Sequence, residues 1–233
     1  RLELRRSVHG LFVTGTDTGV GKTVLAGAII AALASQGRPV RALKPVITGL
    51  DDPVDEDWPP DHELLARAAG CPADQVALIR YGPAVGPHLA AELAGEPIRP
   101  QELCARILSS ASADQTLIVE GVGGLLVPLA EDYDVRRLAV DLRLPLVIAA
   151  RPGLGTINHT LLTLNAARQA GLEVAGVVLT PWPEAPSEIE SSNRETIERL
   201  GEVVVSTLPR LARADPRLLR AAGEQLPLGA WLD

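Results

Sequence analysis

The segment at residues 15–23, which reads GTDTGVGKT, constrains the fold of this chain more than any other. Before it, residues 8–14 are apolar and β-branched and predict a buried strand, and after it residues 24–34 are rich in helix formers. Strand, glycine loop, Lys-Thr and helix in this order form the context that a phosphate-binding loop requires. The glycines let backbone N–H groups turn inward, and the helix N-terminus adds partial positive charge. We therefore expect a nucleotide site in which Lys22 reaches the β- and γ-phosphates and Thr23 ligates Mg²⁺.

The spacing inside this loop departs from the general pattern. Five residues, not four, separate Gly15 from Gly21, and Thr16 occupies the expected glycine position. The alternative is a glycine-rich turn that only caps a helix. The Gly-Lys-Thr sequence between a predicted strand and a predicted helix favours the nucleotide site.

A lysine follows the second predicted strand, at residues 39–44. Lys44 ends that strand and Thr48 comes shortly after it. In parallel α/β sheets, ligands bind beyond the carboxyl ends of the strands, so these side chains would meet a substrate near the phosphates. The alternative is an ordinary exposed cation at a strand end.

Two acidic residues are candidate metal ligands. Glu120 ends an apolar strand at residues 116–120, and three glycines follow within four residues. An acid there can approach Mg²⁺ directly or through water, the alternative being an exposed side chain at a strand–turn junction. Asp61 precedes a predicted helix at 62–70. It can be a helix N-cap or a Mg²⁺ ligand, and spacing alone favours the cap.

The remaining pattern alternates strands and helices. Residues 50–60 read as a solvated loop, and the tail from residue 210 predicts one more short helix. Further strands are predicted at 144–150, at 174–180 and near 203–205, and helices at 100–108, from about 156, and from about 187 to 200. We expect an α/β fold in which residues 1–233 form a single P-loop NTPase-like domain, with a mainly parallel β-sheet flanked by helices on both faces. His88 and His159 could each cap a helix, and the sequence does not choose between that role and one in the site.

Composition excludes several classes of function. The net charge of −7 argues against a nucleic-acid-binding or membrane-binding surface. There is no apolar run of transmembrane length and no signal-peptide pattern, and Cys71 and Cys104 lack metal-ligand spacing, so we expect a cytoplasmic location. Because the chain begins with Arg1 and contains no Met, we expect that the initiator residue is missing from it.

Taken together, the motifs resemble those of the dethiobiotin synthetases. The resemblance rests on the glycine loop and on three later stretches, KPVxTG at 44–49, VEGxGG at 119–124 and GTxNHT at 155–160. It implies a ligase of biotin biosynthesis that joins CO₂ or bicarbonate to 7,8-diaminopelargonic acid, phosphorylates the carbamate with ATP and closes the ureido ring. It also implies a homodimer, with the substrate carboxylate bound at a helix start across the dimer interface.

The resemblance assigns roles to particular residues. It implies Lys44, Lys22 and Thr18 as catalytic residues and Thr23, Asp61 and Glu120 as the Mg²⁺ set, which favours the ligand role of Asp61 over the cap. The substrate residues it implies are Lys44, Thr48, Gly155, Thr156 and Asn158. The nucleotide residues are Asp17, Thr18, Gly19, Val20, Gly21, Lys22, Thr23, Glu120, Gly121, Val122, Gly123, Thr180, Pro181, Leu208, Pro209 and Arg210.

The chain departs from the family pattern at three places. Gly19 stands where many members carry Glu, Pro181 where others place an Asn-Asp pair that reads adenine, and the Pro209 region lacks a Pro-Trp pair. We therefore predict weak selectivity for ATP over other nucleoside triphosphates.

One alternative function is a partition- or septum-site switch ATPase acting through protein partners. Such proteins carry a lysine where Asp17 stands and often end in a basic membrane helix, which this tail lacks. A second alternative, a glutamine-dependent amidating synthetase, would need a further domain.

Overall fold

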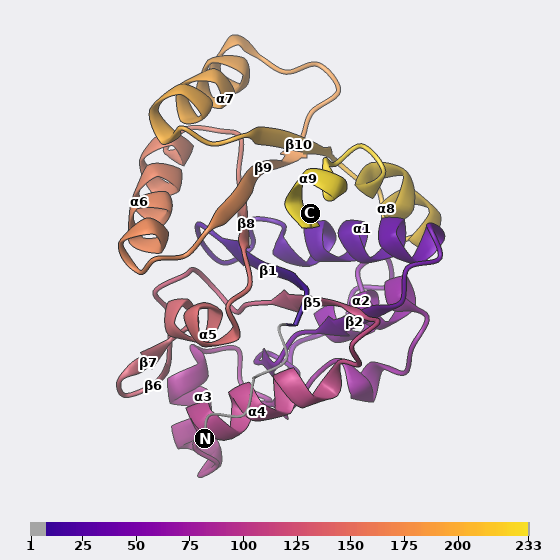
Figure 1. Cartoon of the computed structure of the whole chain (residues 1–233), viewed down its shortest axis with the longest axis vertical. Coiled ribbons are helices and arrows are strands. Elements are labelled where there is room, and N and C mark those ends of the chain that lie inside the picture. The colour runs from indigo at the N-terminus through magenta and orange to yellow at the C-terminus, as the bar shows by residue number, and fades with distance from the viewer. Residues whose placement is uncertain (1–7, 233) are drawn as a thin grey trace.

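A computed structural model describes residues 8–232 of the chain. Its centre is a six-stranded parallel sheet in the order β10-β9-β8-β1-β5-β2 (Figure 1). The strands, in chain order, are β1 (Gly10–Gly15), β2 (Val40–Leu43), β5 (Thr116–Glu120), β8 (Leu146–Ala150), β9 (Val174–Trp182) and β10 (Val205–Pro209). The strands predicted around 8–14, 39–44, 116–120 and 144–150 are confirmed. Three of them, β1, β5 and β8, are apolar runs buried on both faces of the sheet, whereas β2 lies at its edge and is only partly buried.

Helices cover both faces of this sheet, as Figure 1 shows. They are α1 (Lys22–Ser35), α2 (Asp61–Ala69), α3 (Pro87–Ala94), α4 (Pro100–Ser110), α5 (Val135–Leu142), α6 (Thr156–Gln169), α7 (Glu188–Gly201), α8 (Pro216–Gly223) and α9 (Leu228–Leu232). Two short strand pairs lie outside the sheet, β3 (Val46–Ile47) with β4 (Ile79–Arg80) and β6 (Pro128–Ala130) with β7 (Tyr133–Asp134). This is the expected α/β fold of the P-loop NTPase type, with the glycine loop directly after the first strand.

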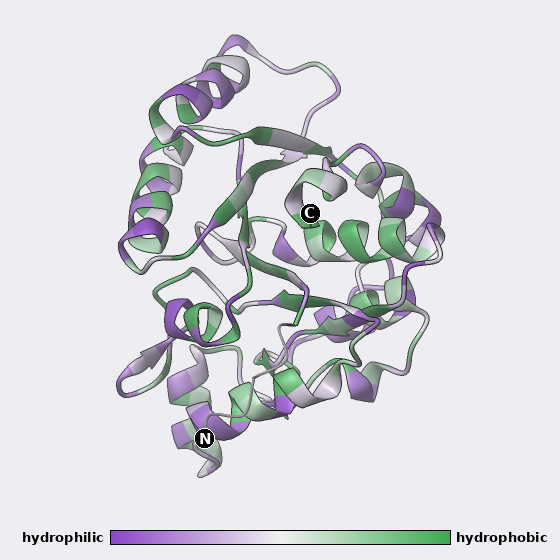
Figure 2. Cartoon of the chain, in the orientation of Figure 1, coloured by the Kyte–Doolittle hydropathy of each residue, from purple (hydrophilic) through white to green (hydrophobic). Residues whose placement is uncertain are grey.

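The core has two halves, one on each side of the sheet. In β1, Leu11 and Val13 pack toward α1, whereas Phe12 packs toward α5 and its neighbours. Figure 2 shows α1 hydrophobic around most of its surface. This helix can be so apolar because α2 and α8 cover the sides that the sheet leaves open.

Three details differ from the sequence predictions. The strand β9 continues to Trp182 instead of ending at Thr180, because its last residue still pairs with β10. The last strand lies at 205–209 and not near 203–205, since the N–H of Val203 is still bound to α7 through the carbonyl of Glu198. The tail forms two helices, α8 and α9, where one was expected.

Within residues 8–232, no helix is both long enough and apolar enough to cross a membrane.

Candidate active site

The glycine loop has the geometry of an anion cradle. Gly21 lies in the left-handed region at φ 93° and is the N-cap of α1. A Cβ atom at that position would lie 2.8 Å from Cγ2 of Thr180, so both the backbone conformation and the space require glycine. Lys22 folds back over the loop and donates from Nζ to the carbonyl of Asp17 at 2.7 Å. The loop therefore surrounds the start of α1 with a cation and backbone N–H groups.

A buried cluster of charges lies beside the loop. Nζ of Lys44 donates to Oε1 of Glu120 at 2.8 Å and also contacts Oδ2 of Asp61. The hydroxyl of Thr23 donates to the same Oε1 at 2.8 Å. The other carboxylate oxygen of Glu120, Oε2, is buried and has no hydrogen-bond partner. Strands β2 and β5 are neighbours in the sheet, so their carboxyl ends bring Lys44 and Glu120 together.

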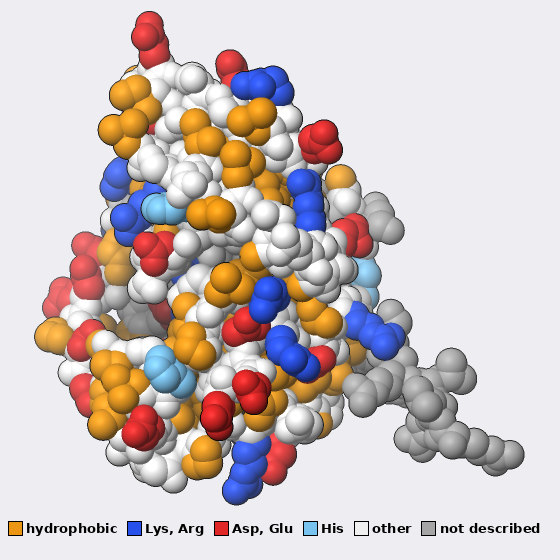
Figure 3. All heavy atoms as spheres, turned by 90° about the vertical axis from the view of Figure 1, so that its left-hand side faces the viewer, with side chains coloured by type: hydrophobic (Ala, Val, Ile, Leu, Met, Phe, Trp, Pro, Cys, Tyr) orange, Lys and Arg blue, Asp and Glu red, His pale blue; other side chains and the backbone are white. Residues whose placement is uncertain are grey.

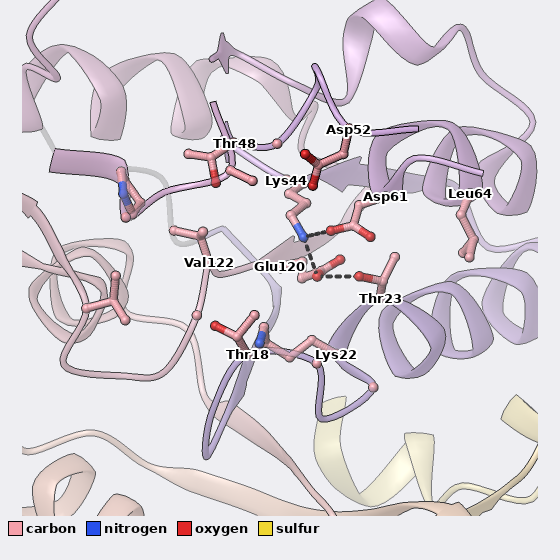
Figure 4. A pocket seen from close by; sticks show the side chains of 18 of the residues that line it. Thr18, Lys22, Thr23, Lys44, Thr48, Asp52, Asp61, Leu64, Glu120 and Val122 are labelled. Carbon is pink, nitrogen blue, oxygen red and sulfur yellow. Dashed lines mark hydrogen bonds and ion pairs between the residues drawn. The ribbon is translucent and has the colours of Figure 1, made fainter. Parts of the chain in front are cut away.

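The N-cap role that spacing alone favours for Asp61 is wrong. Asp61 is the first residue of α2, and the N-cap is Pro60, which makes no side-chain capping bond. The carboxylate instead turns toward Lys44, as Figure 4 shows. The ion pair with the buried ammonium of Lys44 is stronger than a local capping bond. The residues next to Asp61 in the sequence do not reveal this ion pair, because Lys44 lies 17 residues away.

Burial and charge act against each other in this cluster. Burial favours the neutral form of Lys44, but the charges of Glu120 and Asp61 outweigh it and hold the pKa of Lys44 above its ordinary value. Burial raises the pKa of Glu120, and the ammonium of Lys44 only partly offsets this effect. Burial likewise lowers the pKa of Lys22, against the charge of Glu120. The cluster thus keeps a permanent cation, Lys44, inside the protein.

The chain contains only two lysines, and both are in this site. All its other basic side chains of the Lys/Arg type are arginines. Lys22 is 6% exposed and Lys44 is 5% exposed, although lysine is among the residue types least often buried. This composition is a sequence signal that points to the two residues without any family resemblance.

The cluster and the glycine loop line one cleft of about 780 Å³ (Figure 4). Half of the predicted site residues meet there, namely Thr18, Gly19, Gly21, Lys22, Thr23, Lys44, Thr48, Asp61, Glu120, Val122 and Gly123. In Figure 4, Lys44, Thr48 and Asp61 reach into the cleft from one side. Thr18, Lys22 and Thr23 reach in from the other, with Glu120 between the two groups.

Other predicted residues lie outside this cleft. Asp17 is exposed on the loop, Val20 is buried in the core, and a Cβ on Gly121 would touch Phe12. The predicted nucleotide residues Thr180, Pro181, Leu208, Pro209 and Arg210 gather at the carboxyl ends of β9 and β10, where the methyl group of Thr180 faces Gly21. The predicted substrate residues Gly155, Thr156 and Asn158 form the start of α6 and do not line the cleft of this chain.

Several residues of the site went unnoticed in the sequence. Asp52, Trp58, Pro59, Leu64, Val85 and Val127 also line the cleft. They lie in loops or on a helix whose own patterns carry no chemical signal. Asn193 of α7 holds the loop before α6, because its buried amide donates to the carbonyls of Pro152 and Gly153 at 2.9 and 3.1 Å. His88 and His159 are both exposed, and neither side chain caps its helix.

This fold and site define a P-loop nucleotide-binding protein: the first strand of a parallel sheet enters a glycine loop, and a lysine and a threonine open the helix that follows. A family model described as "AAA domain" matches residues 9–217. The solved structure of chloroplast FtsY from Physcomitrella patens aligns with 96% of this chain and 67% of that chain, at 14% identity and a TM-score of 0.48, a likeness too weak to support an argument.

Curated relatives place the chain more narrowly. It is 36% identical over 208 residues to the ATP-dependent dethiobiotin synthetase BioD of Bacillus subtilis subsp. natto, covering 88% of this chain and 89% of the relative. It is 41% identical over 223 residues to the protein of the same name from Mycobacterium avium (strain 104), covering 95% and 94% of the two chains. It is 35% identical over 223 residues to the protein of the same name from Haloferax mediterranei, covering 94% of this chain and 92% of the relative. The chain belongs to the ATP-dependent dethiobiotin synthetase family, an ATP-dependent ligase family, which confirms the resemblance and disfavours the switch ATPase.

Proposed function

We propose that this chain makes dethiobiotin from 7,8-diaminopelargonic acid, CO₂ and ATP in the 780 Å³ cleft. The observation that carries the proposal is the convergence of the two lysines of the chain, both buried, on one cleft beside a glycine loop. The reaction brings a triphosphate and a carbamate together, and two such anions repel each other unless cations lie between them.

The reaction proceeds in three steps. One amine of the substrate attacks CO₂ and loses a proton, which gives a carbamate. A carbamate oxygen then attacks the γ-phosphorus and ADP leaves, giving a carbamic–phosphoric anhydride. The second amine attacks the carbamate carbon, loses its proton and expels phosphate, which closes the ureido ring.

The side chains of the cleft act mainly by position and charge. Lys22, at the start of α1, holds the β- and γ-phosphates, and Lys44 stabilises the charge shared between carbamate and γ-phosphate. Thr18 and Thr48 hydrogen-bond the diamine or its carbamate from opposite sides of the cleft. No side chain is required as a covalent nucleophile.

Thr23, Asp61 and Glu120 are the residues that would hold Mg²⁺. The unpartnered buried oxygen Oε2 of Glu120 fits this role, because a hard cation binds carboxylate and hydroxyl oxygens. The ion would neutralise charge on the β- and γ-phosphates. Among residues 8–232, no group of three His, Cys, Asp or Glu side chains could hold a metal alone, so the hydroxyl of Thr23 and the phosphates would complete the site.

The adenosine would lie along the carboxyl ends of β9 and β10. Thr180, Pro181, Leu208, Pro209 and Arg210 meet there, and Thr180 lies next to Gly21 of the glycine loop, so a nucleotide with its phosphates on Lys22 can reach this group. This placement keeps the base outside the cleft and leaves the cleft for the diamine.

The substrate carboxylate would bind at the start of α6 of a second subunit. Gly155, Thr156 and Asn158 do not reach the cleft of their own chain, so their predicted role needs a homodimer. Leu154 and Leu162, just before and on α6, are 88% and 59% exposed. Figure 3 views the molecule from the side of α6 and α7 and shows hydrophobic side chains exposed there among charged ones. Such a surface suits an interface with another copy.

The direct test is to incubate the protein with Mg·ATP, bicarbonate and 7,8-diaminopelargonic acid and to look for dethiobiotin by mass spectrometry. Absence of product from a folded protein would reject the proposal. Lys44→Ala should abolish turnover while nucleotide binding stays close to that of the parent protein, whereas Lys22→Ala should weaken both. A collapse of nucleotide affinity in Lys44→Ala would mean that Lys44 is wrongly placed.

A further inference from the structure

Asp52 is a cleft carboxylate that the Lys44 cluster does not use. Three carboxylates among the described residues line the cleft, and two of them, Asp61 and Glu120, are paired with Lys44. In the part of the chain that the structure describes, the carboxylate of Asp52 makes neither an ion pair nor a hydrogen bond. Figure 4 shows that this carboxylate points into the cleft from the side of Thr48 and Lys44, which lies opposite the glycine loop.

The backbone holds Asp52 in this position. Gly49, at φ 84°, starts a tight turn whose carbonyl accepts the N–H of Asp52 at 3.3 Å. The turn is tied to the neighbouring segment because the N–H groups of Gly49 and Asp51 donate to the carbonyls of Pro83 and Gly82, both at 3.0 Å. Asp52 is thus presented by an anchored turn, in a loop that otherwise reads as solvated.

The adjacent Asp51 faces a different way. Its carboxylate lies against Gly82, where a Cβ atom would come within 2.3 Å of Oδ2. Asp51 does not line the cleft. Two acids that are neighbours in the sequence therefore have different surroundings, and only one of them can contact a molecule in the cleft.

We propose that Asp52 binds the positively charged amine of the diamine substrate and so acts as a specificity-determining residue; this inference rests on the proposed function. A vicinal diamine near neutral pH carries one ammonium group, because a second positive charge beside the first is repelled. The neutral amine is free to attack CO₂, and Asp52 holds its charged neighbour.

The surroundings of Asp52 fit this substrate. The phosphates lie on the glycine loop, across the cleft from Asp52, so the carboxylate does not add to their negative charge at close range. Val85, Val122 and Val127 also line the cleft and give the methylene chain of the substrate an apolar wall. A carboxylate in a cleft that is otherwise lined by such apolar side chains selects an amine over an uncharged group of the same size.

Asp52→Asn tests the assignment, and Asp51→Asn is its matched control. Calorimetry with a non-hydrolysable ATP analogue present measures binding of 7,8-diaminopelargonic acid and of two analogues that keep only one of its amines. We expect Asp52→Asn to weaken diamine binding about tenfold, to raise its KM with little change in kcat, and to leave nucleotide affinity unchanged. The difference should shrink at high salt, since Asp52 is exposed. Asp51→Asn should behave like the parent protein, and Asp52→Glu should recover part of the affinity.

Two outcomes would overturn the inference. One is equal diamine affinity in Asp52→Asn and Asp51→Asn. The other is a higher Mg²⁺ requirement in Asp52→Asn at unchanged diamine affinity, which would place Asp52 in the surroundings of the metal. Dethiobiotin formation by the parent protein is measured in parallel. Its absence would reject the proposed function, whereas normal product formation with either outcome above would reject only the role of Asp52.

Discussion

Replacing Lys44 by methionine would leave the buried carboxylate of Glu120 without its ion-pair partner in the described structure. Removing one member of a buried pair costs about 3–5 kcal/mol because it leaves an uncompensated charge. The side chain of Asp61 is 44% exposed and can be hydrated, so most of the cost falls on Glu120, whose side chain is fully buried. We expect Lys44→Met to lower the free energy of unfolding by about 3 kcal/mol, at the lower end of that range.

Adding Glu120→Gln to Lys44→Met should restore much of this stability. Glutamine removes the charge and keeps an oxygen that can accept the hydrogen bond from Thr23. The double variant should therefore be about 2 kcal/mol more stable than Lys44→Met alone. The exposed pair Arg220–Glu224, 2.7 Å apart, provides a control cycle in which the coupling should stay below about 1 kcal/mol.

Urea denaturation of the four proteins of each cycle, without nucleotide and with a chelator, measures these free energies. A change in the midpoint at constant slope reports stability alone. If Lys44→Met and Glu120→Gln added to within about 0.5 kcal/mol, the two residues would not be coupled and our account of the cluster would be refuted.

Two other predictions concern the nucleotide. Gly21→Ala and Gly37→Ala both force a side chain into the left-handed region, at φ 93° and 74°, but only the first meets a neighbour, Thr180, whereas Gly37 faces open space. Gly37→Ala should lose about 1 kcal/mol of stability, and Gly21→Ala should lose more because of the contact with Thr180. Only Gly21→Ala should weaken ATP binding, by about tenfold or more in a fluorescent-nucleotide titration, and equal affinities of the two variants would contradict this prediction. At the base end, the N–H of Arg210 is already donated to Trp182, which leaves fewer groups to read a base. The rates of dethiobiotin formation with ATP, CTP and GTP should therefore lie within about tenfold of one another, and a strict requirement for ATP would disprove this prediction.

Much of the sheet could be predicted from the sequence because its central strands β1, β5 and β8 are buried on both faces. Such strands are continuous apolar runs, and β5 and β8 are recognisable without any partner. The predicted bounds of an element are wrong where contacts with neighbouring elements determine its ends. Val203 and Val204 have strand-forming side chains, but the N–H of Val203 is still bound to the carbonyl of Glu198 in α7, and β10 begins only at Val205. The helix α5 was missed because it has only eight residues, although Asp134 caps it through the N–H of Arg137.

Only part of the candidate site could be predicted, because local sequence patterns place some of its residues and not others. Residues within one motif, such as Lys22 and Thr23, are placed by the local strand–loop–helix geometry. Contacts between motifs depend on the order of strands in the sheet, which no local pattern gives. The pairing of Lys44 with Glu120 is of this second kind, because it needs β2 beside β5. The pairing of Lys44 with Asp61 depends in the same way on the packing of α2 against β2.

The acids of the cluster explain how a site for anions can exist before any anion binds. A buried ammonium without a partner would lose its proton or turn toward solvent, because burial strongly disfavours an unpaired charge. Glu120 and Asp61 supply the negative charge that keeps Lys44 protonated and hold its side chain in one direction. The cation is therefore already oriented when the substrates arrive, and little reorganisation is needed during phosphoryl transfer. It follows that Lys44→Arg, which keeps the charge but changes the shape and length of the side chain, should not substitute for lysine in catalysis.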